Sequence, residues 1–462
     1  MSSRPAAVSF LQALRFWGHL GLVSFGGPAG QIAIMHQELV ERRHWISERR
    51  FLHALNYCMV LPGPEAQQLA TYIGWLMHRN AGGLMAGGLF VLPSLVLLIG
   101  LSWVYAAFGH LALVAGVFYG VKPAVTAIVL QAAHRIGKRT LRNSVLGSLA
   151  LAAFVGIFFF DLPFPLIVLV AAALGVLGGR WRPRLFQLGG AHGGALKGYG
   201  PALIDDDTPS PLHARPDRAR LTRVVLVGAA CWLLPMLALR MVAQTQPAFL
   251  AMGWFFSKAA LLTFGGAYAV LPYVYQGAVS HFAWLSAGQM IDGLALGETT
   301  PGPLIMVVAF VGFMAGYAHA LLGPDQLFLA GALAAVVVTW FTFLPSFVFV
   351  LAGGPLVEAS RDSVHLTAPL TAITAAVVGV IVNLALFFAL HVLWPAGTGL
   401  QVRGVADLAA VIPATLQRMD GLALVLMLAA ALALLRFGRS VPQVILTCAA
   451  LGAWGHWLGL GG

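Results

Sequence analysis

The sequence predicts an all-α polytopic membrane protein of two homologous halves, each containing two membrane segments that are broken by glycine and proline. Three observations predict it. Of the 462 residues, 59% are hydrophobic and only 9% are charged, whereas soluble domains carry roughly 25% charged residues. The apolar residues gather in long runs, which favours helices because membrane strands would show short alternating segments. A glycine- and proline-rich motif also occurs twice in one register.

Nine apolar runs approach the roughly 20 helical residues that cross a bilayer core of about 30 Å. They are 82–108, 111–133, 145–160, 163–179, 221–243, 327–353, 365–393, 420–437 and 440–460. The third and fourth runs are predicted to form a hairpin that turns at Asp161. The two halves are predicted as 1–179 and 246–462, joined by a basic linker at 180–220 and a connecting transmembrane helix at 221–245. The linker is polar and has no apolar period, so we expect a flexible cytoplasmic connector.

The duplication shows as four matched pairs that share one separation. Residues 24–28 match 263–267, Trp45 matches Trp284, Ser47 matches Ser286, and 62–64 match 301–303, each 239 positions apart. Later the register slips, because 92–94 match 344–346 at a separation of 252. Two copies of a unit with paired breaks are typical of secondary transporters with discontinuous membrane helices.

The net charge of +11 does not indicate a nucleic-acid partner, because of where the positive residues lie. Sixteen of the 27 Lys and Arg residues lie at 42–50, 135–142 and 180–223, between apolar runs. The positive-inside rule places these segments, and the N-terminus with them, in the cytoplasm. The loop 275–289 has no Lys or Arg, where the matched loop 36–50 has four. This inversion favours inverted repeats, with parallel repeats as the alternative.

The breaks themselves predict an anion site. A break exposes backbone N–H and C=O groups that lipid cannot satisfy, and the helix N-terminus after it offers unpaired N–H donors and partial positive charge. Glycine lets a ligand approach the backbone closely. Packing of small residues between helices is the alternative explanation. The candidate substrate-binding residues are Ser24, Phe25, Gly26, Gly27, Pro28, Gln31, Pro62, Gly63, Pro64, Thr263, Gly265, Gly266, Thr299, Thr300, Pro301, Gly302 and Pro303.

Charged residues at membrane depth cost roughly 2.5–3.5 kcal/mol at the centre, so each requires a reason. His19 aligns with Lys258, and each either attracts an anion or reaches to the membrane surface. Glu65 and Glu298 flank the second breaks, and both would fit an anion site if they carry protons, because burial disfavours a charged carboxylate. For Glu65 the alternative is an acid favourably placed in the first turn of a helix. The coupling candidates are His19, Glu65, Lys122, Lys258 and Glu298, with Asp292 as a further candidate.

Four stretches carry a family resemblance: FGGP at 25–28 followed by Gln31, MHQELV at 35–40, WIS at 45–47 and LPGPEA at 61–66. The chain resembles the long, two-copy form of the chromate ion transporter family, over nearly its whole length apart from the linker. The resemblance implies a plasma-membrane exporter of chromate that confers chromate resistance, with a proton gradient as the driving force. The second copy has Ala267 in place of the proline of the first motif, so the two halves are expected to contribute unequally.

Several alternatives stay open at this point. Sulfate is a tetrahedral dianion like chromate, so a sulfate or other oxyanion transporter, or an anion channel, fits the same pattern. An ATP-driven pump is not favoured, since the chain has no G-x-x-x-x-G-K-[ST] motif. A membrane-embedded enzyme is less favoured, since it would normally show clustered Asp or His ligands at metal spacing, and the second break has no such pair. Its three cysteines lie singly, so we expect no metal or cofactor. The expected partners are the oxyanion, protons and membrane lipid, and a small-residue face at Gly83 and Gly87 would permit a homodimer.

Overall fold

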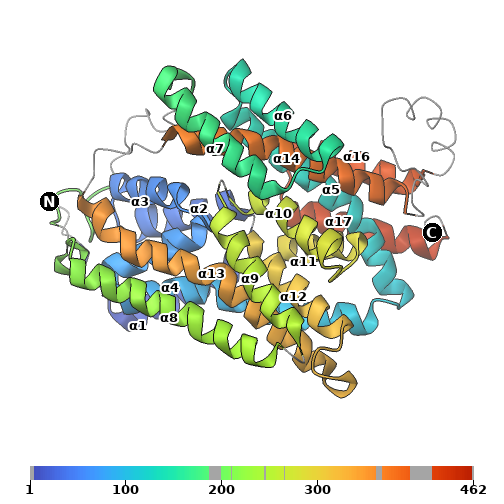
Figure 1. Cartoon of the computed structure of the whole chain (residues 1–462), viewed down its shortest axis with the longest axis horizontal. Helices are drawn as coiled ribbons and strands as arrows, with labels where there is room; N and C mark the ends of the chain where they lie inside the picture. Colours follow the sequence, from blue (N-terminus) through green and yellow to red (C-terminus); the bar gives the residue numbers. More distant parts are fainter. Residues whose placement is uncertain are drawn as a thin grey trace. The chain divides into compact units, whose positions relative to one another are not determined.

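The computed structural model describes residues 5–25, 27–186, 199–209, 211–243, 246–264, 266–359, 367–395 and 419–459. Within these ranges the regular structure is helical, apart from one isolated bridge between Ile46 and Ile204 (Figure 1). The chain divides into two compact units. Unit 1 comprises Met1–Ile99, Leu188–Ala267 and Thr300–Thr367, and unit 2 comprises Gly100–Gln187, Tyr268–Thr299 and Ala368–Gly462. Each unit therefore contains segments from both halves of the sequence.

Unit 1 contains the segments with the clearest family resemblance. Its elements are α1 (Phe10–Val23), α2 (Gly27–His36), the π-helical turn η1 (Gln37–Arg42), α3 (Glu48–Val60), the first part of α4 (Glu65–Phe108), η3 (Leu212–Ala214), α8 (Arg218–Val242), α9 (Pro247–Leu262), η5 (Leu304–Met306), α12 (Val307–Ala318), η6 (Pro324–Gln326) and α13 (Leu327–Ala359). α13 packs against α8, α9 and α12. Met35, Leu39 and Trp45 lie in the core with Trp17 and Trp75, so part of the family motif serves packing.

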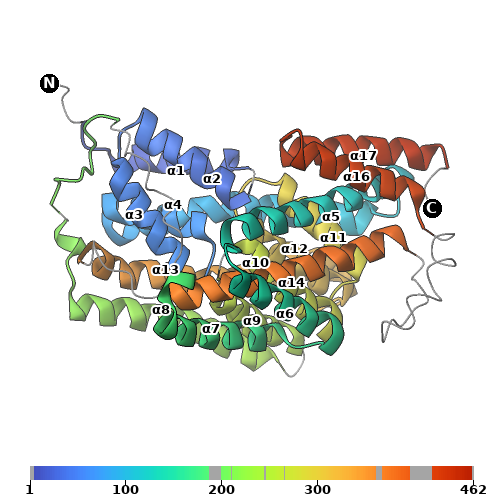
Figure 2. The ribbon, with the colours of Figure 1, turned by 90° about the horizontal axis from the view of Figure 1, so that it is seen from above.

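Unit 2 is organised around α5. Its elements are the end of α4, α5 (Ala112–Thr140), α6 (Ser144–Phe160), α7 (Phe164–Trp181), η2 (Pro183–Leu185), α10 (Ala267–Tyr275), the π-helical turn η4 (Gln276–His281), α11 (Ala287–Thr299), α14 (Thr367–Leu393), α16 (Gly421–Leu435) and α17 (Val441–Trp457). α5 packs against α11, α16 and α17, and the last two run beside it in Figure 2. The predicted hairpin of α6 and α7 is confirmed, and Asp161 turns it with a φ of +48°.

Six of the described helices are long and apolar enough to cross a membrane, namely α4, α5, α7, α8, α13 together with η6, and α14. The predicted all-helical, multi-pass class is therefore confirmed. Three expected runs form shorter helices: α6 and α17 have 17 residues each and α16 has 15. α4 bends at His78 and Arg79, which leave the helical conformation, so its 44 residues form two helices that meet close to the predicted start of the run 82–108.

Positions 239 residues apart adopt the same local backbone conformation. The π-helical turn Gln37–Arg42 corresponds to Gln276–His281. His44 and Ala283, which follow these turns, both have positive φ values, of 51° and 49°. A residue with a side chain rarely adopts a positive φ. Here two such residues adopt it at positions that the sequence repeat matches.

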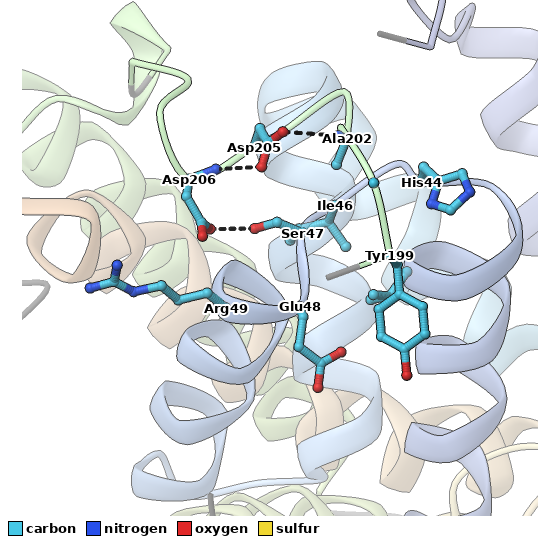
Figure 3. Close-up of a pocket in the computed structure, with 11 residues that line it drawn as sticks. His44, Ile46, Ser47, Glu48, Arg49, Tyr199, Ala202, Asp205 and Asp206 are labelled. Carbon is cyan, nitrogen blue, oxygen red and sulfur yellow. Dashed lines mark hydrogen bonds between the residues drawn. The ribbon is translucent and has the colours of Figure 1, made fainter. Parts of the chain in front are cut away.

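The described part of the linker contradicts the expectation of a flexible connector. Leu203 and Ile204 donate backbone hydrogen bonds to the carbonyls of His44 and Trp45, and Ser47 donates to the carbonyl of Ile204, at 2.9–3.0 Å. The Ser47 hydroxyl donates to Asp206 at 2.6 Å, beside a pocket of about 130 Å³ (Figure 3). The side chain of Ile204 is buried. A few apolar residues and backbone pairing thus fix a segment whose composition is polar.

Candidate functional site

All four predicted breaks are real interruptions between helices. The second glycine of each glycine pair and the single glycine of each PGP triplet have positive φ values: Gly27 has +68°, Gly63 +130°, Gly266 +94° and Gly302 +107°. Glycine alone adopts such backbone conformations without strain. A helix begins at or just after each of these glycines: α2 at Gly27, α4 after Gly63, α10 after Gly266 and η5 after Gly302. The first glycines, Gly26 and Gly265, lie outside the described residues.

The breaks meet inside unit 1 through two reciprocal main-chain hydrogen bonds. The N–H of Gly63 donates to the carbonyl of Thr263 at 2.7 Å, and the N–H of Gly302 donates to the carbonyl of Ser24 at 2.9 Å. Ser24 and Thr263 are matched positions, as are Gly63 and Gly302. Each bond therefore joins the first break of one half to the second break of the other.

Glutamine side chains from the first half reinforce the meeting of the breaks, which we call the crossing. The Gln31 amide nitrogen donates to the carbonyl of Ser24 at 3.4 Å and also to the carbonyl of Gly302. The Gln68 amide nitrogen donates to the carbonyl of Pro62 at 2.8 Å. Positions 270 and 307, which match these glutamines, are both valine. The first half therefore supplies the polar side chains that hold the crossing.

Two serines that we had not predicted as site residues close against the second breaks. A Cβ atom placed on Gly63 would lie 2.2 Å from Ser346 Oγ, and one on Gly302 would lie 2.7 Å from the Ser94 Cβ. Ser94 and Ser346 are each 1% exposed, and each follows a proline inside α4 or α13. They occupy the matched LPS triplets, which the sequence analysis used only for register. The signal was present, but nothing in the sequence alone placed these triplets beside the breaks.

Several hydroxyl and N–H donors at the breaks are engaged within the protein. The Thr263 hydroxyl donates to the carbonyl of Ala259 at 2.7 Å, and the Thr299 hydroxyl donates to carbonyls of its own helix at 3.0 and 3.1 Å. Threonine often bonds backward in this way within a helix. The N–H groups of Gly63 and Gly302 are likewise taken by carbonyls. These four donors are therefore not directed at an anion.

Other buried polar atoms have no hydrogen-bond partner among the described residues. In unit 1 near the breaks they are Ser24 Oγ, Ser94 Oγ, Gln31 Oε1, Gln67 Oε1 and Gln68 Oε1. Buried polar groups are normally hydrogen-bonded, so such a cluster requires a ligand or ordered water. The two serine hydroxyls can donate to an oxyanion, whereas the amide oxygens only accept and suit water. A Cβ on Gly27 would meet nothing within 4 Å, so space is open at that helix N-terminus.

The remaining predicted residues differ in exposure. Gly63, Pro64, Thr263, Gly266, Thr300, Pro301, Gly302 and Pro303 are buried, Gly27, Pro28, Pro62 and Thr299 are half-buried, and Phe25 is exposed. The prolines flank the positive-φ glycines and limit the conformations of the chain on either side. The buried set is therefore concentrated at the two second breaks.

The coupling candidates fall in both units. In unit 1, the His19 and Lys258 side chains are exposed, while Glu65 is half-buried with an oxygen 3.8 Å from the position of a Cβ on Gly266. In unit 2, Lys122 forms an ion pair with Asp292 at 3.6 Å, and buried Glu298 accepts a hydrogen bond from Tyr268.

The small-residue face proposed for a dimer is used inside the protomer. A Cβ on Gly87 would lie 2.1 Å from Thr71 Oγ1 and 2.5 Å from the ring of Phe347. One on Gly83 would lie 3.1 Å from the carbonyl of Thr71. These glycines therefore allow α4 to fold back on itself and to pack against α13, and they give no support to a dimer.

Interrupted apolar helices that meet at their breaks define this chain as a membrane transporter. A family model described as "Chromate transporter" matches residues 11–176 and 250–453. The chain belongs to the chromate transporter family.

Named relatives agree with this membership. The chain is 33% identical to a chromate transport protein of Pseudomonas aeruginosa over 82% of this chain and 80% of that one. It is 29% identical to a chromate transport protein of Cupriavidus metallidurans, with 82% of each chain covered. A probable chromate transport protein of Synechococcus elongatus is 30% identical over 72% of this chain and 76% of its own length. No solved structure matches the chain.

Proposed function

We propose that the protein is a secondary active transporter that exports chromate across the plasma membrane and so confers chromate resistance. A proton gradient drives the export. The observation that carries the proposal is the reciprocal pairing of Gly63 with Thr263 and of Gly302 with Ser24. A carrier needs a site at which its two repeats meet and can move against each other. The two bonds provide such a meeting point, and the family membership supports chromate as the substrate.

Within this proposal, the oxyanion binds at the open N-terminus of α2, in front of Gly27. The hydroxyls of Ser24 and Ser94 are its closest available donors, because both are buried and have no hydrogen-bond partner among the described residues. The partial charge of the helix N-terminus adds attraction. The residues that hold the breaks in place, such as Gln31, position the site without donating to the anion.

The proposed orientation places the two halves, 1–179 and 246–462, as inverted repeats. The matched π-helical turns η1 and η4 support a repeat, and the loss of positive charge from the loop 275–289 supports inversion. The N-terminus and the linker then lie in the cytoplasm. Cysteine labelling from each side of the membrane tests this: positions 49 and 288 should label from opposite sides, whereas parallel repeats would label from one side.

The transport proposal is tested with everted membrane vesicles that contain the protein. We expect saturable chromate uptake that increases when a proton gradient is imposed. Sulfate is measured in parallel, since both dianions fit the same donors. Flux that neither saturates nor responds to the gradient would identify a channel, and absence of chromate flux under every gradient would refute the proposal.

The site is tested by a matched pair of serine substitutions. Ser24→Ala removes a hydroxyl beside the breaks that has no hydrogen-bond partner among the described residues, whereas Ser102→Ala removes an equally buried hydroxyl of the same kind from the part of α4 that belongs to unit 2. A hydrogen bond to a charged group contributes about 1.5–3 kcal/mol, so Ser24→Ala should weaken chromate binding by about 10- to 100-fold. Neither variant should lose stability. Equal effects of the two variants would show that Ser24 does not bind the anion.

A further inference from the structure

Unit 2 contains a buried carboxylate that is incompletely paired. The Asp292 side chain on α11 is 4% exposed. Its Oδ2 atom accepts a hydrogen bond from the Tyr105 hydroxyl at 2.8 Å and lies 3.6 Å from Lys122 Nζ. Its Oδ1 atom is buried and has no hydrogen-bond partner among the described residues. The three residues come from α11, the end of α4 and α5, so tertiary packing assembles them.

The pairing only partly offsets the cost of burying the charge of Asp292. A buried ion pair offsets its desolvation only when geometry is good and the remaining lone pairs are satisfied. Here the separation of 3.6 Å is longer than that of a strong charged hydrogen bond, which is about 2.7–2.9 Å, and Oδ1 is unsatisfied. A proton on Oδ1 would remove the buried charge while Tyr105 kept its bond to Oδ2.

The exposure of Lys122 allows its ion pair with Asp292 to open. Its side chain is 34% exposed, so its ammonium group can keep its charge in contact with solvent when the ion pair opens. A fully buried lysine would lose its charge in the same event. The partial exposure also gives protons a route to the carboxylate. Asp292, Lys122 and Tyr105 together therefore have two states that differ by one proton, and neither state leaves a buried charge without a partner or solvent.

The other titratable groups near α11 are engaged elsewhere. On α11 itself, Glu298 accepts a hydrogen bond from Tyr268, and Arg135 of α5 acts electrostatically on it. Tyr119 of α5 donates to Asp420. From α17, Cys448 and His456 lie against Gly120 and Gly116 of α5. Within the part of the chain that the structure describes, the charged and titratable groups that contact Asp292 are thus Lys122 and Tyr105.

We propose that Asp292 is the residue that binds and releases the coupling proton, with Lys122 as its exchangeable counter-ion and Tyr105 as the residue that positions its carboxyl group. In the step, a proton passes from water to Asp292 Oδ1, the ion pair opens, and the net charge of the three residues rises by one. Deprotonation reverses each change. This proposal rests on the proposed proton-coupled transport and names the site of that coupling.

The test uses the full-length protein in liposomes and compares two fluxes. Exchange of labelled chromate at equal pH needs no net proton movement, whereas accumulation under a pH gradient does. One pH unit corresponds to about tenfold accumulation per coupled proton. We expect Asp292→Asn to keep exchange and to lose that accumulation, Lys122→Met to lose it also, and Tyr105→Phe to shift its pH profile. Asp325→Asn, an exposed carboxylate in η6, is the matched control and should behave as the unmodified protein.

An independent readout separates this proposal from the transport proposal. Infrared difference spectra between high and low pH should show the carbonyl band of protonated buried carboxylic acids, diminished in Asp292→Asn and fully retained in Asp325→Asn. Glu298 is also buried, so the part of the band that Asp292→Asn removes is the signal of interest. Gradient-driven accumulation by Asp292→Asn at the level of the unmodified protein, or an undiminished band in it, would overturn the proposal. If the unmodified protein shows the band and carries no chromate, the transport proposal fails and the proton site stands.

Discussion

Gly302→Ala should destabilise the protein by a combination of strain and overlap that the structure allows us to estimate. The residue has a φ of +107°, which an alanine adopts only with strain, at a cost of about 1–3 kcal/mol. Its Cβ would lie 2.7 Å from the Cβ of Ser94, well inside an ordinary carbon contact of about 3.5–4.0 Å. Overpacking of this kind costs about 1–3 kcal/mol. The total is about 2–6 kcal/mol.

The assay is the inactivation rate of the detergent-solubilised protein, because membrane proteins of this size unfold irreversibly and their stability is then a rate. Gly88→Ala is the matched control, since a Cβ there would meet nothing within 4 Å and the residue does not have positive φ. Ser94→Gly in the Gly302→Ala background should recover about 1–2 kcal/mol, as expected for two residues in direct contact. If Gly302→Ala is as stable as Gly88→Ala, or if Ser94→Gly recovers nothing, the second break does not close against α4 as described.

Three further predictions concern other parts of the chain. Arg50→Met should cost about 3–5 kcal/mol in thermal denaturation, because it strands the buried carboxylate of Glu358, its ion-pair partner; a loss below about 1 kcal/mol would mean a solvated pair. Gly87→Ala should lower the inactivation temperature equally at all protein concentrations, since its contacts are within the protomer; a concentration-dependent loss would indicate a dimer contact. Partial burial lowers the pKa of His213; the positive charge of Arg220 lowers it further, and the hydrogen bond to the Trp75 carbonyl opposes the shift. Docking of the linker should therefore be complete above about pH 6.5, the ordinary pKa of histidine, and should weaken as the pH falls. Hydrogen exchange of peptides covering 199–217, corrected for its intrinsic pH dependence, measures this, and His213→Phe should remove the effect.

Replacing Gly63 with valine would not test the anion site. A Cβ at Gly63 would already lie 2.2 Å from Ser346 Oγ and 2.6 Å from Gln68 Nε2. Loss of transport in that variant would therefore report distortion of the protein and would say nothing about the anion. Ser24→Ala avoids this problem, because it removes atoms and adds none.

Much of the fold could be predicted from local sequence. Glycine next to proline marked three of the four breaks, and the charge pattern marked the α6–α7 hairpin, since both signals depend on a few neighbouring residues. The break at Gly266 has no adjacent proline and was marked by its register with the first copy. What could not be predicted depends on residues far apart in the chain. The contact of Gly302 with Ser94, the pairing of Lys122 with Asp292, and the docking of Ile204 on the loop at Trp45 all require the tertiary arrangement. Threonine hydroxyls beside a break were misjudged because the bond to their own helix carbonyl competes with a ligand.

The crossing of the breaks pairs residues that are synthesised at different times. The carbonyl of Ser24 accepts from the N–H of Gly302, which is made later, and the N–H of Gly63 likewise has to wait for the carbonyl of Thr263. At a translation speed of about 5–20 residues per second, Ser24 emerges roughly 15–55 s before the residue that completes it. During that interval the polar backbone of the first break is in or near the membrane without its partner. The nascent chain therefore needs water, the insertion machinery or a temporary contact to shelter that segment, and a pause in synthesis between the two halves would lengthen the vulnerable period.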